Sequence, residues 1–145
     1  MDNRKRNKLL KKLNATSPQL NLLVIRRANQ INSKLQRCEK MVVAGAECGR
    51  IKEHGLSGFL KRKHYLQPSL ESHYESKLGV KEGEMSTVEK RYPVGNCAEC
   101  EAVNKVICKN NNININIISV SLAVGCRKFD IICPCHNCDA LFFKK

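Results

Sequence analysis

Apolar residues recur at alternating three- and four-residue steps through the first third of the chain, starting just after Pro18. This is the period of an amphipathic helix, and proline is favoured in a first helical turn. The pattern therefore predicts one helix over residues 18–44. Glycines and basic residues crowd residues 45–68, which we expect to form a loop. A shorter helix is predicted over residues 69–79, closed by a glycine, whereas residues 80–95 show no period.

The last third of the chain switches between two periods. An apolar helical stripe covers residues 98–109 and ends at a run of asparagines. Alternating isoleucines then predict a strand over residues 113–124, and a second strand is expected over residues 129–133. A short final helix would occupy residues 135–145. The order helix, strand, strand, helix indicates an α/β fold class with a helical N-terminal extension.

The charge divides the chain into two parts. Of 145 residues, 26 are Lys or Arg and 13 are Asp or Glu, a formal charge of +13. Residues 1–92 hold 20 basic and 9 acidic side chains, and residues 93–145 hold 6 and 4. This excess favours a polyanion, such as DNA or RNA, as partner, and Lys61, Arg62 and Lys63 form one candidate contact. We expect a basic extension over residues 1–68 and a domain over residues 69–145, or a single domain.

The apolar runs and the cysteine count bear on the compartment. No run approaches the roughly 18 apolar residues of a transmembrane helix, so we expect no membrane partner. The basic start of the chain lacks the apolar core of a signal peptide. Nine cysteines, an odd number, then indicate reduced thiols and a reducing, cytoplasmic compartment rather than a disulfide framework.

Seven of the nine cysteines lie in the last third of the chain, and four of them form two pairs. Cys97 and Cys100 open the predicted helix at residue 98, and Cys135 and Cys138 open the final one. Free N–H groups at a helix start favour the thiolate, which is the metal-binding form of cysteine. The pairs therefore predict a zinc site.

With their neighbours, the two pairs resemble the signature of the zinc-dependent deaminase superfamily, in which His or Cys, any residue and Glu precede a distant Pro-Cys-x-x-Cys. Here the motifs read Cys97-Ala98-Glu99 and Pro134-Cys135-His136-Asn137-Cys138. Together with the preceding Gly95-Asn96, they look most like the YwqJ-like deaminase domains of bacterial polymorphic toxins. The resemblance covers residues 93–145. It implies a cytidine deaminase-like α/β fold with a small mixed sheet and zinc motifs at two helix N-termini.

The resemblance also implies roles for single residues. The zinc ligands would be Cys97, Cys135 and Cys138. Glu99 would carry protons from the attacking water to the base and the leaving ammonia. The Ala98 backbone N–H would bind the base carbonyl, and Asn96 the sugar. The implied reaction is hydrolytic deamination of a nucleobase, preferably cytosine in nucleic acid.

A toxin of this kind would act in the cytoplasm of a recipient cell, reached without a signal peptide, and an immunity protein would be its further partner. Deaminases of this kind also place two strands before the first zinc helix. Residues 80–95 predict none, so either the sheet is small or the strands lie in the middle of the chain.

Three other interpretations remain open at the level of sequence. A deaminase could act on a free nucleoside or nucleotide instead of a polymer. The two Cys-x-x-Cys pairs could form a four-thiolate structural zinc site in a nucleic-acid-binding module without catalysis. Thiol redox chemistry is a third interpretation. In the deaminase interpretation Cys100 is only a helix residue, so its role separates a deaminase from the four-thiolate module.

Overall fold

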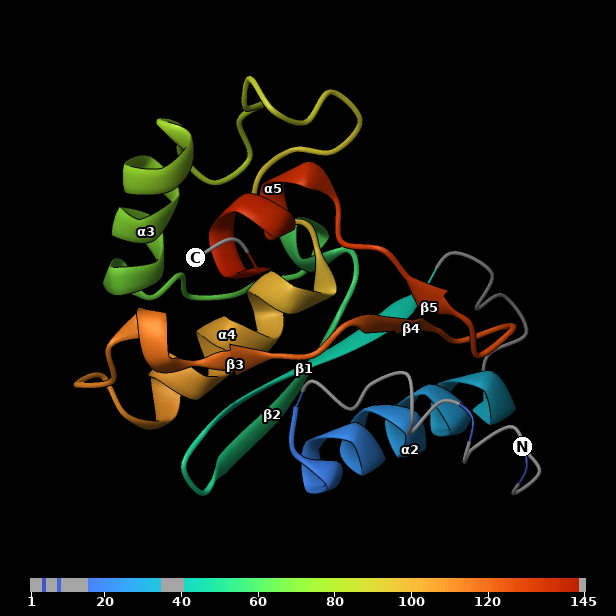
Figure 1. Ribbon diagram of the computed structural model, residues 1–145. Helices are drawn as coiled ribbons and strands as arrows, with labels where there is room; N and C mark the ends of the chain where they lie inside the picture. Colours follow the sequence, from blue (N-terminus) through green and yellow to red (C-terminus); the bar gives the residue numbers. More distant parts are fainter. Residues whose placement is uncertain (1–3, 5–7, 9–15, 35–40, 144–145) are drawn as a thin grey trace.

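The fold centres on a small antiparallel sheet (Figure 1). The computed structural model describes residues 4, 8, 16–34 and 41–143, with only the backbone of residues 33 and 34. The strands are β1 (Val42–Cys48), β2 (Ile51–Leu56), β3 (Ser119–Val120), β4 (Ala123–Gly125) and β5 (Ile131–Ile132). They follow the order β2-β1-β4-β5, with β3 also paired to β1. The α/β class with a small sheet is confirmed.

The expected mixture of parallel and antiparallel strands is wrong, because every pairing between the described strands is antiparallel. The connections explain two of the four pairings, β1 with β2 and β4 with β5. Residues 49 and 50 alone join β1 to β2, and five residues join β4 to β5. Neither connection is long enough for the crossover that a parallel pair of strands requires.

The helix expected over residues 18–44 is correct for its first part only. Helix α2 (Pro18–Lys34) begins where predicted, residues 35–40 lie outside the described part, and β1 begins at Val42. The loop expected over residues 45–68 contains most of a β-hairpin, β1–β2, followed by the short 3-10 turn Phe59–Lys61. β1 lies in the middle of the sheet and is apolar on both faces. Its run of small and β-branched residues therefore resembled a continuation of the apolar helical stripe before it.

Two of the three glycines of this hairpin, Gly45 and Gly55, serve close packing, whereas Gly49 lies in its turn. A Cβ placed on Gly45 would lie 2.7 Å from side-chain atoms of both Leu20 and Val24 on α2. A Cβ on Gly55 would lie 2.2 Å from the carbonyl oxygen of Ala98, in helix α4 (Ala98–Lys109). The two glycines therefore let a helix approach the hairpin closely on each side.

Three layers result, with α2 on one face of the sheet and α4 on the other (Figure 1). Helices α3 (Pro68–Leu78) and α5 (His136–Cys138) lie on the α4 side. The predictions for α4 and for a helix closed by Gly79, whose φ is 70°, are confirmed. The final helix is shorter than expected, since α5 passes into a π-helical turn over Asp139–Phe143. Strands from before and after residue 68 pair in the one sheet.

The strand expected over residues 113–124 does not form as one element. Residues Ile115–Ile117 form a 3-10 turn, in which the side chain of Asn114 accepts a hydrogen bond from the Asn116 N–H at 2.9 Å. Asparagine side chains stabilise turns by such local bonds, and here they outweigh the isoleucine alternation. The strand expected over residues 129–133 is also shorter, because Phe129 has a φ of 55° and belongs to the turn before β5.

A β-bulge separates β3 from β4. Ala46 pairs with Val120 and Val43 with Val124. Between these two pairs, three residues of the β3–β4 segment lie opposite two residues of β1. Because facing residues alternate, the extra residue turns Val120 toward α4 and Val124 toward α2. Both faces of the sheet thereby receive a valine from one short segment.

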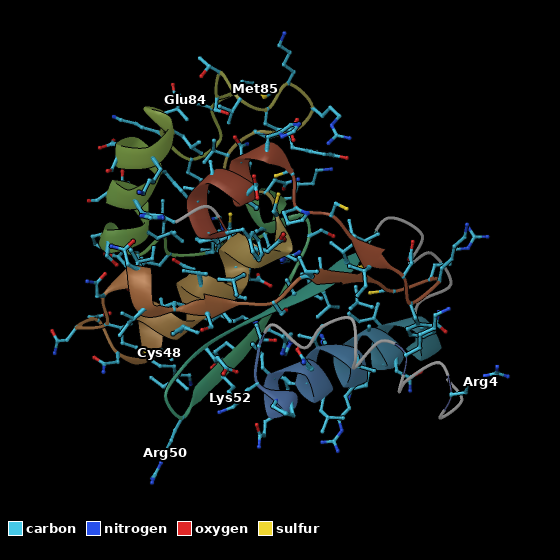
Figure 2. The ribbon with its side chains drawn as sticks, in the orientation of Figure 1. Arg4, Cys48, Arg50, Lys52, Glu84 and Met85 are labelled. Atoms are coloured by element: carbon cyan, nitrogen blue, oxygen red, sulfur yellow. The ribbon has the colours of Figure 1, made fainter. Side chains whose placement is uncertain are left out.

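Residues 80–97 form a long connection without a helix or strand, and it passes over α5 (Figure 1). Figure 2 shows Glu84 and Met85 at its outer edge, far from the sheet. We call residues 80–97 the crossing loop. In the part of the chain that the structure describes, no helix combines the length and apolarity needed to cross a membrane.

Candidate metal centre

Three cysteines converge where two helices begin. Cys97 directly precedes α4 and Cys135 directly precedes α5, so both lie beside backbone N–H groups that have no partner within the helix. Cys138 closes the single turn of α5, and its N–H lies 3.5 Å from the Cys135 Sγ. All three Sγ atoms lie within 4.8 Å of one another, and those of Cys97 and Cys135 are 3.3 Å apart. Among the described residues, no second group of three or more Cys, His, Asp or Glu side chains brings its potential ligand atoms this close together.

We call Cys97, Cys135 and Cys138 the cysteine centre, and this group could hold a metal ion. A Zn–S bond of about 2.3 Å in a tetrahedron places neighbouring sulfur atoms about 3.8 Å apart, close to the spacing found here. Thiolates favour zinc and other soft or borderline ions over magnesium or calcium. Three protein ligands also leave a fourth position open, which is the arrangement of catalytic rather than structural zinc.

The three thiols of the cysteine centre differ in pKa. Hydrogen bonds from the thiols of Cys138 and Cys97 lower the pKa of Cys135 to about 3. The pKa of Cys97 is raised, chiefly by its bond to Cys135, and that of Cys138 is raised chiefly by a bond to Cys100. Cys135, at the start of α5, is therefore the most readily ionised of the three thiols, and a cation that binds there would displace protons from the other two.

Cys100 lies one helical turn after Cys97 and is buried, with 1% of its surface exposed. It is close enough to raise the pKa of Cys138, yet it does not belong to the group whose sulfur atoms all lie within 4.8 Å. This geometry favours three ligands over the four-thiolate interpretation.

Glu99 is the buried acid beside the cysteine centre. Its surface is 3% exposed, and it lines a cavity of about 230 Å³, the inner cavity, together with Cys97 and Cys135. Burial raises the pKa of Glu99 to about 7, with a further contribution from the negative charge on Cys135. An acid with a pKa near 7 can both accept and donate a proton at neutral pH. The inner cavity therefore holds an acid able to exchange a proton at neutral pH, beside two of the three candidate ligands.

The other two predicted site residues also line the inner cavity. Ala98 is buried in the first turn of α4. The backbone carbonyl of Asn96 accepts hydrogen bonds from the N–H groups of Gly58 at 3.0 Å and Phe59 at 3.4 Å, and its Oδ1 accepts from Leu60 N–H at 3.4 Å. Asn96 is therefore fixed by the segment that follows β2. All six residues predicted for the site lie in the lining of the inner cavity or in the cysteine centre beside it.

A larger, basic cleft of about 920 Å³ adjoins the inner cavity, and the two share Val42, Ser57, Tyr92, Asn96 and Ile132 as lining residues. We call it the outer cleft. Its charged lining residues are Lys61, Arg127, Lys128 and Asp130, three basic and one acidic. An anionic group bound there would lie directly beside the inner cavity.

The structure separates the three adjacent basic residues predicted to contact nucleic acid. Lys61 lines the outer cleft, and Lys63 is exposed outside it. The Arg62 guanidinium instead donates to the carbonyls of Ser57 and Leu56 at 2.8 and 2.9 Å, and forms an ion pair with Glu101 at 2.8 Å. Arg62 thus holds the end of β2 against α4.

Two pairs of residues that line the cavities were not predicted from the sequence, one in a turn and one in the crossing loop. Arg127 and Lys128 come from the turn between β4 and β5, where two adjacent basic residues were the available signal. Arg91 and Tyr92 come from the crossing loop, which has no hydrophobic period to mark it.

No protein-family model matches the chain, and neither a curated protein nor a solved structure is significantly similar to it.

Proposed function

We propose that this protein is a zinc-dependent hydrolase that deaminates a nucleobase, with cytosine as the preferred base. The observation that carries the proposal is the position of Glu99, a buried acid with a raised pKa, in one cavity with two of three clustered cysteines. A structural zinc site needs no such acid, whereas hydrolytic deamination needs one beside the metal.

The cysteine centre and Glu99 have distinct tasks in the proposed reaction. Zinc, when bound by Cys97, Cys135 and Cys138, supplies a Lewis acid that makes water acidic enough to ionise near neutral pH. The Glu99 carboxylate accepts the proton of the attacking water and delivers it to the ring nitrogen of the base. The new hydroxyl on the ring carbon then gives up its proton, which Glu99 passes to the amino group, and the amino group leaves as ammonia while the C–OH becomes a carbonyl.

The size of the inner cavity supports a small reacting group. Pockets for drug-sized ligands measure about 300–1,000 Å³. The inner cavity, at about 230 Å³, is smaller and suits a single base, while the outer cleft has room for its sugar and phosphates. The three basic residues that line the outer cleft favour a substrate with phosphates, and the charge of +13 favours a polymer, DNA or RNA.

The decisive experiment compares the wild-type protein with Glu99→Gln at equal zinc occupancy. Glutamine preserves the size of the side chain but cannot carry the proton, so we expect deamination to fall by ~10²–10⁴-fold. Glu84→Gln, an exposed acid of the crossing loop, is the matched control and should retain activity. The assay measures base conversion in single- and double-stranded DNA and RNA and in free nucleosides.

Two results would contradict the proposal. Wild-type activity in Glu99→Gln would show that Glu99 does not carry the proton in the reaction. A zinc-loaded wild-type protein that converts no base in any of these substrates would favour the nucleic-acid-binding module without catalysis.

A further inference from the structure

The crossing loop is fastened to α5 by side chains from both partners. The Ser86 hydroxyl bonds the Oδ1 of Asn137, and the Asn137 Nδ2 donates to the Tyr92 carbonyl at 3.1 Å. Ser86 and Asn137 are both buried. A loop without regular structure is therefore held firmly over the helix that begins at the candidate ligand Cys135.

Glu89 makes the most unusual of these contacts. Its side chain is buried, with 1% of the residue's surface exposed. One carboxylate oxygen, Oε1, accepts a hydrogen bond from the backbone N–H of His136 at 3.0 Å. The other, Oε2, accepts from the backbone N–H of Arg91 at 3.1 Å and from its Nε at 3.5 Å. The two oxygens of one carboxylate thus hold two different segments.

Each of these segments belongs to one half of the site. His136 directly follows the candidate ligand Cys135, so the bond to Oε1 fixes the backbone at the start of α5. Arg91 lines the inner cavity, and its guanidinium lies 5.2 Å from the ring centre of Tyr92, which lines both the inner cavity and the outer cleft. The bond to Oε2 therefore fixes the part of the cavity wall that a substrate would pass on its way in.

We propose that Glu89 is a positioning residue that couples the metal centre to the substrate entrance, Oε1 orienting Cys135 and Oε2 orienting the Arg91–Tyr92 wall. The metal half of this inference rests only on the cysteine centre binding a metal. The entrance half rests on the proposed deamination.

The chemistry of the contact explains why a carboxylate is needed. A buried carboxylate is costly unless several donors satisfy it, and Glu89 has two backbone N–H donors and one guanidinium donor. An amide at the same position offers one oxygen, and its NH₂ group would face the second N–H. Glu89→Gln therefore keeps the shape of the side chain but can satisfy only one of the two halves.

The first test measures the metal without any substrate. Zinc affinity is determined by chelator competition, and ligand geometry by the absorption bands of the cobalt(II)-loaded protein. Groups that orient ligands typically contribute ~10–100-fold to metal affinity. We expect Glu89→Ala, and to a smaller extent Glu89→Gln, to weaken zinc binding within that range and to shift the cobalt bands. Glu84→Gln, the same change of charge in the same loop, should leave both unchanged.

The second test separates the two oxygens. Arg91→Ala removes the side chain on the Oε2 side only, so we expect wild-type zinc affinity and cobalt bands, but a raised KM in base conversion. Unchanged zinc affinity and cobalt bands in both Glu89 variants would overturn the proposal, even if their thermal stability falls, since that pattern indicates a purely structural role. These metal measurements stand whether or not the protein deaminates a base, so the two proposals can fail separately.

Discussion

The Sγ atoms of Cys97 and Cys135 lie 3.3 Å apart although 38 positions separate the two residues in the chain. Both residues directly precede a helix. The chain between them forms α4 and the strands β3, β4 and β5, and it returns so that the two helix starts lie side by side. The Cys135 Sγ accepts a hydrogen bond from the Cys138 N–H at 3.5 Å, and the backbone N–H groups at a helix start favour negative charge nearby. A cluster of thiolates needs such compensation, because three of them around one divalent cation leave a net charge of −1.

We expect one zinc ion per chain, held by three cysteines and not by four. Cys97→Ser, Cys135→Ser and Cys138→Ser should each abolish stoichiometric zinc binding, because an alcohol is a poor replacement for a thiolate ligand. Cys100→Ser should keep the metal, since Cys100 lies outside the cluster of mutually close sulfur atoms. Elemental analysis of the purified variants is the measurement. Loss of zinc from Cys100→Ser as complete as from Cys97→Ser would establish the four-thiolate site instead.

The outer cleft should bind phosphates through the two lysines that line it. Neutralising Lys61 and Lys128 together should weaken binding to a polynucleotide and lower the slope of log affinity against log salt by about 1.4–1.8, since each lost phosphate contact removes ~0.7–0.9. Lys63→Ala with Lys77→Ala, both exposed and outside the cleft lining, is the control with the same loss of charge. An equal change of slope in the two double variants would mean that general charge, and not the cleft, attracts the polymer.

Gly55 should be required for the position of α4 and therefore of Cys97. A methyl group at position 55 would meet the Ala98 carbonyl at 2.2 Å and the Ala102 N at 2.5 Å, both of which are backbone atoms. We expect Gly55→Ala to lower the free energy of unfolding by at least the ~1–3 kcal/mol typical of overpacking, and to weaken zinc binding.

The control for this change is Gly49→Ala at the tip of the hairpin. A methyl group there meets nothing within 4 Å and is opposed only by the φ of 60°. It should lower stability by about 1–2 kcal/mol but leave zinc affinity unchanged. Denaturant unfolding and chelator competition report the two effects, and equal zinc affinity in both variants would contradict the prediction.

His64 and Glu82 should stabilise the fold more in mildly acidic than in alkaline solution. Burial by itself lowers the pKa of His64, but hydrogen bonds to the Arg62 carbonyl and the Glu82 carboxylate, the latter at 3.0 Å, together raise it. A histidine whose pKa is higher in the folded state adds stability that is complete below its unfolded value of about 6.5 and is lost as pH rises through the folded value.

Glu82→Gln should therefore lower Tm more at pH 6 than at pH 8.5. Glu84→Gln, two residues further along the crossing loop, should show no such difference between the two pH values. Thermal unfolding followed by circular dichroism gives both comparisons. A decrease in Tm that is equal at the two pH values would show that the pair acts only as a neutral hydrogen bond.

Local patterns in the sequence were sufficient for α4, for the start of α2 and for the cysteine pairs that contain the candidate ligands. The apolar stripe and the asparagines after it placed α4 at residues 98–109, and the two Cys-x-x-Cys pairs marked the helix starts that hold Cys97 and Cys135. These features depend on residues within one or two turns of each other, so they can be recognised without the fold.

Only the tertiary structure decided the sheet and the walls of the cavities. Gly45 and Gly55 resembled a loop in the sequence because the helices that pack against them, α2 and α4, are distant along the chain. The number of ligands likewise depends on distances between segments, which place Cys100 outside the mutually close sulfur atoms of the cysteine centre. Glu89 lies in a segment without any period, and its importance comes from two hydrogen-bonded segments, one of them 47 positions away. Long-range contacts of this kind leave no local repeat, because the residues that make them share a location only after the chain has folded.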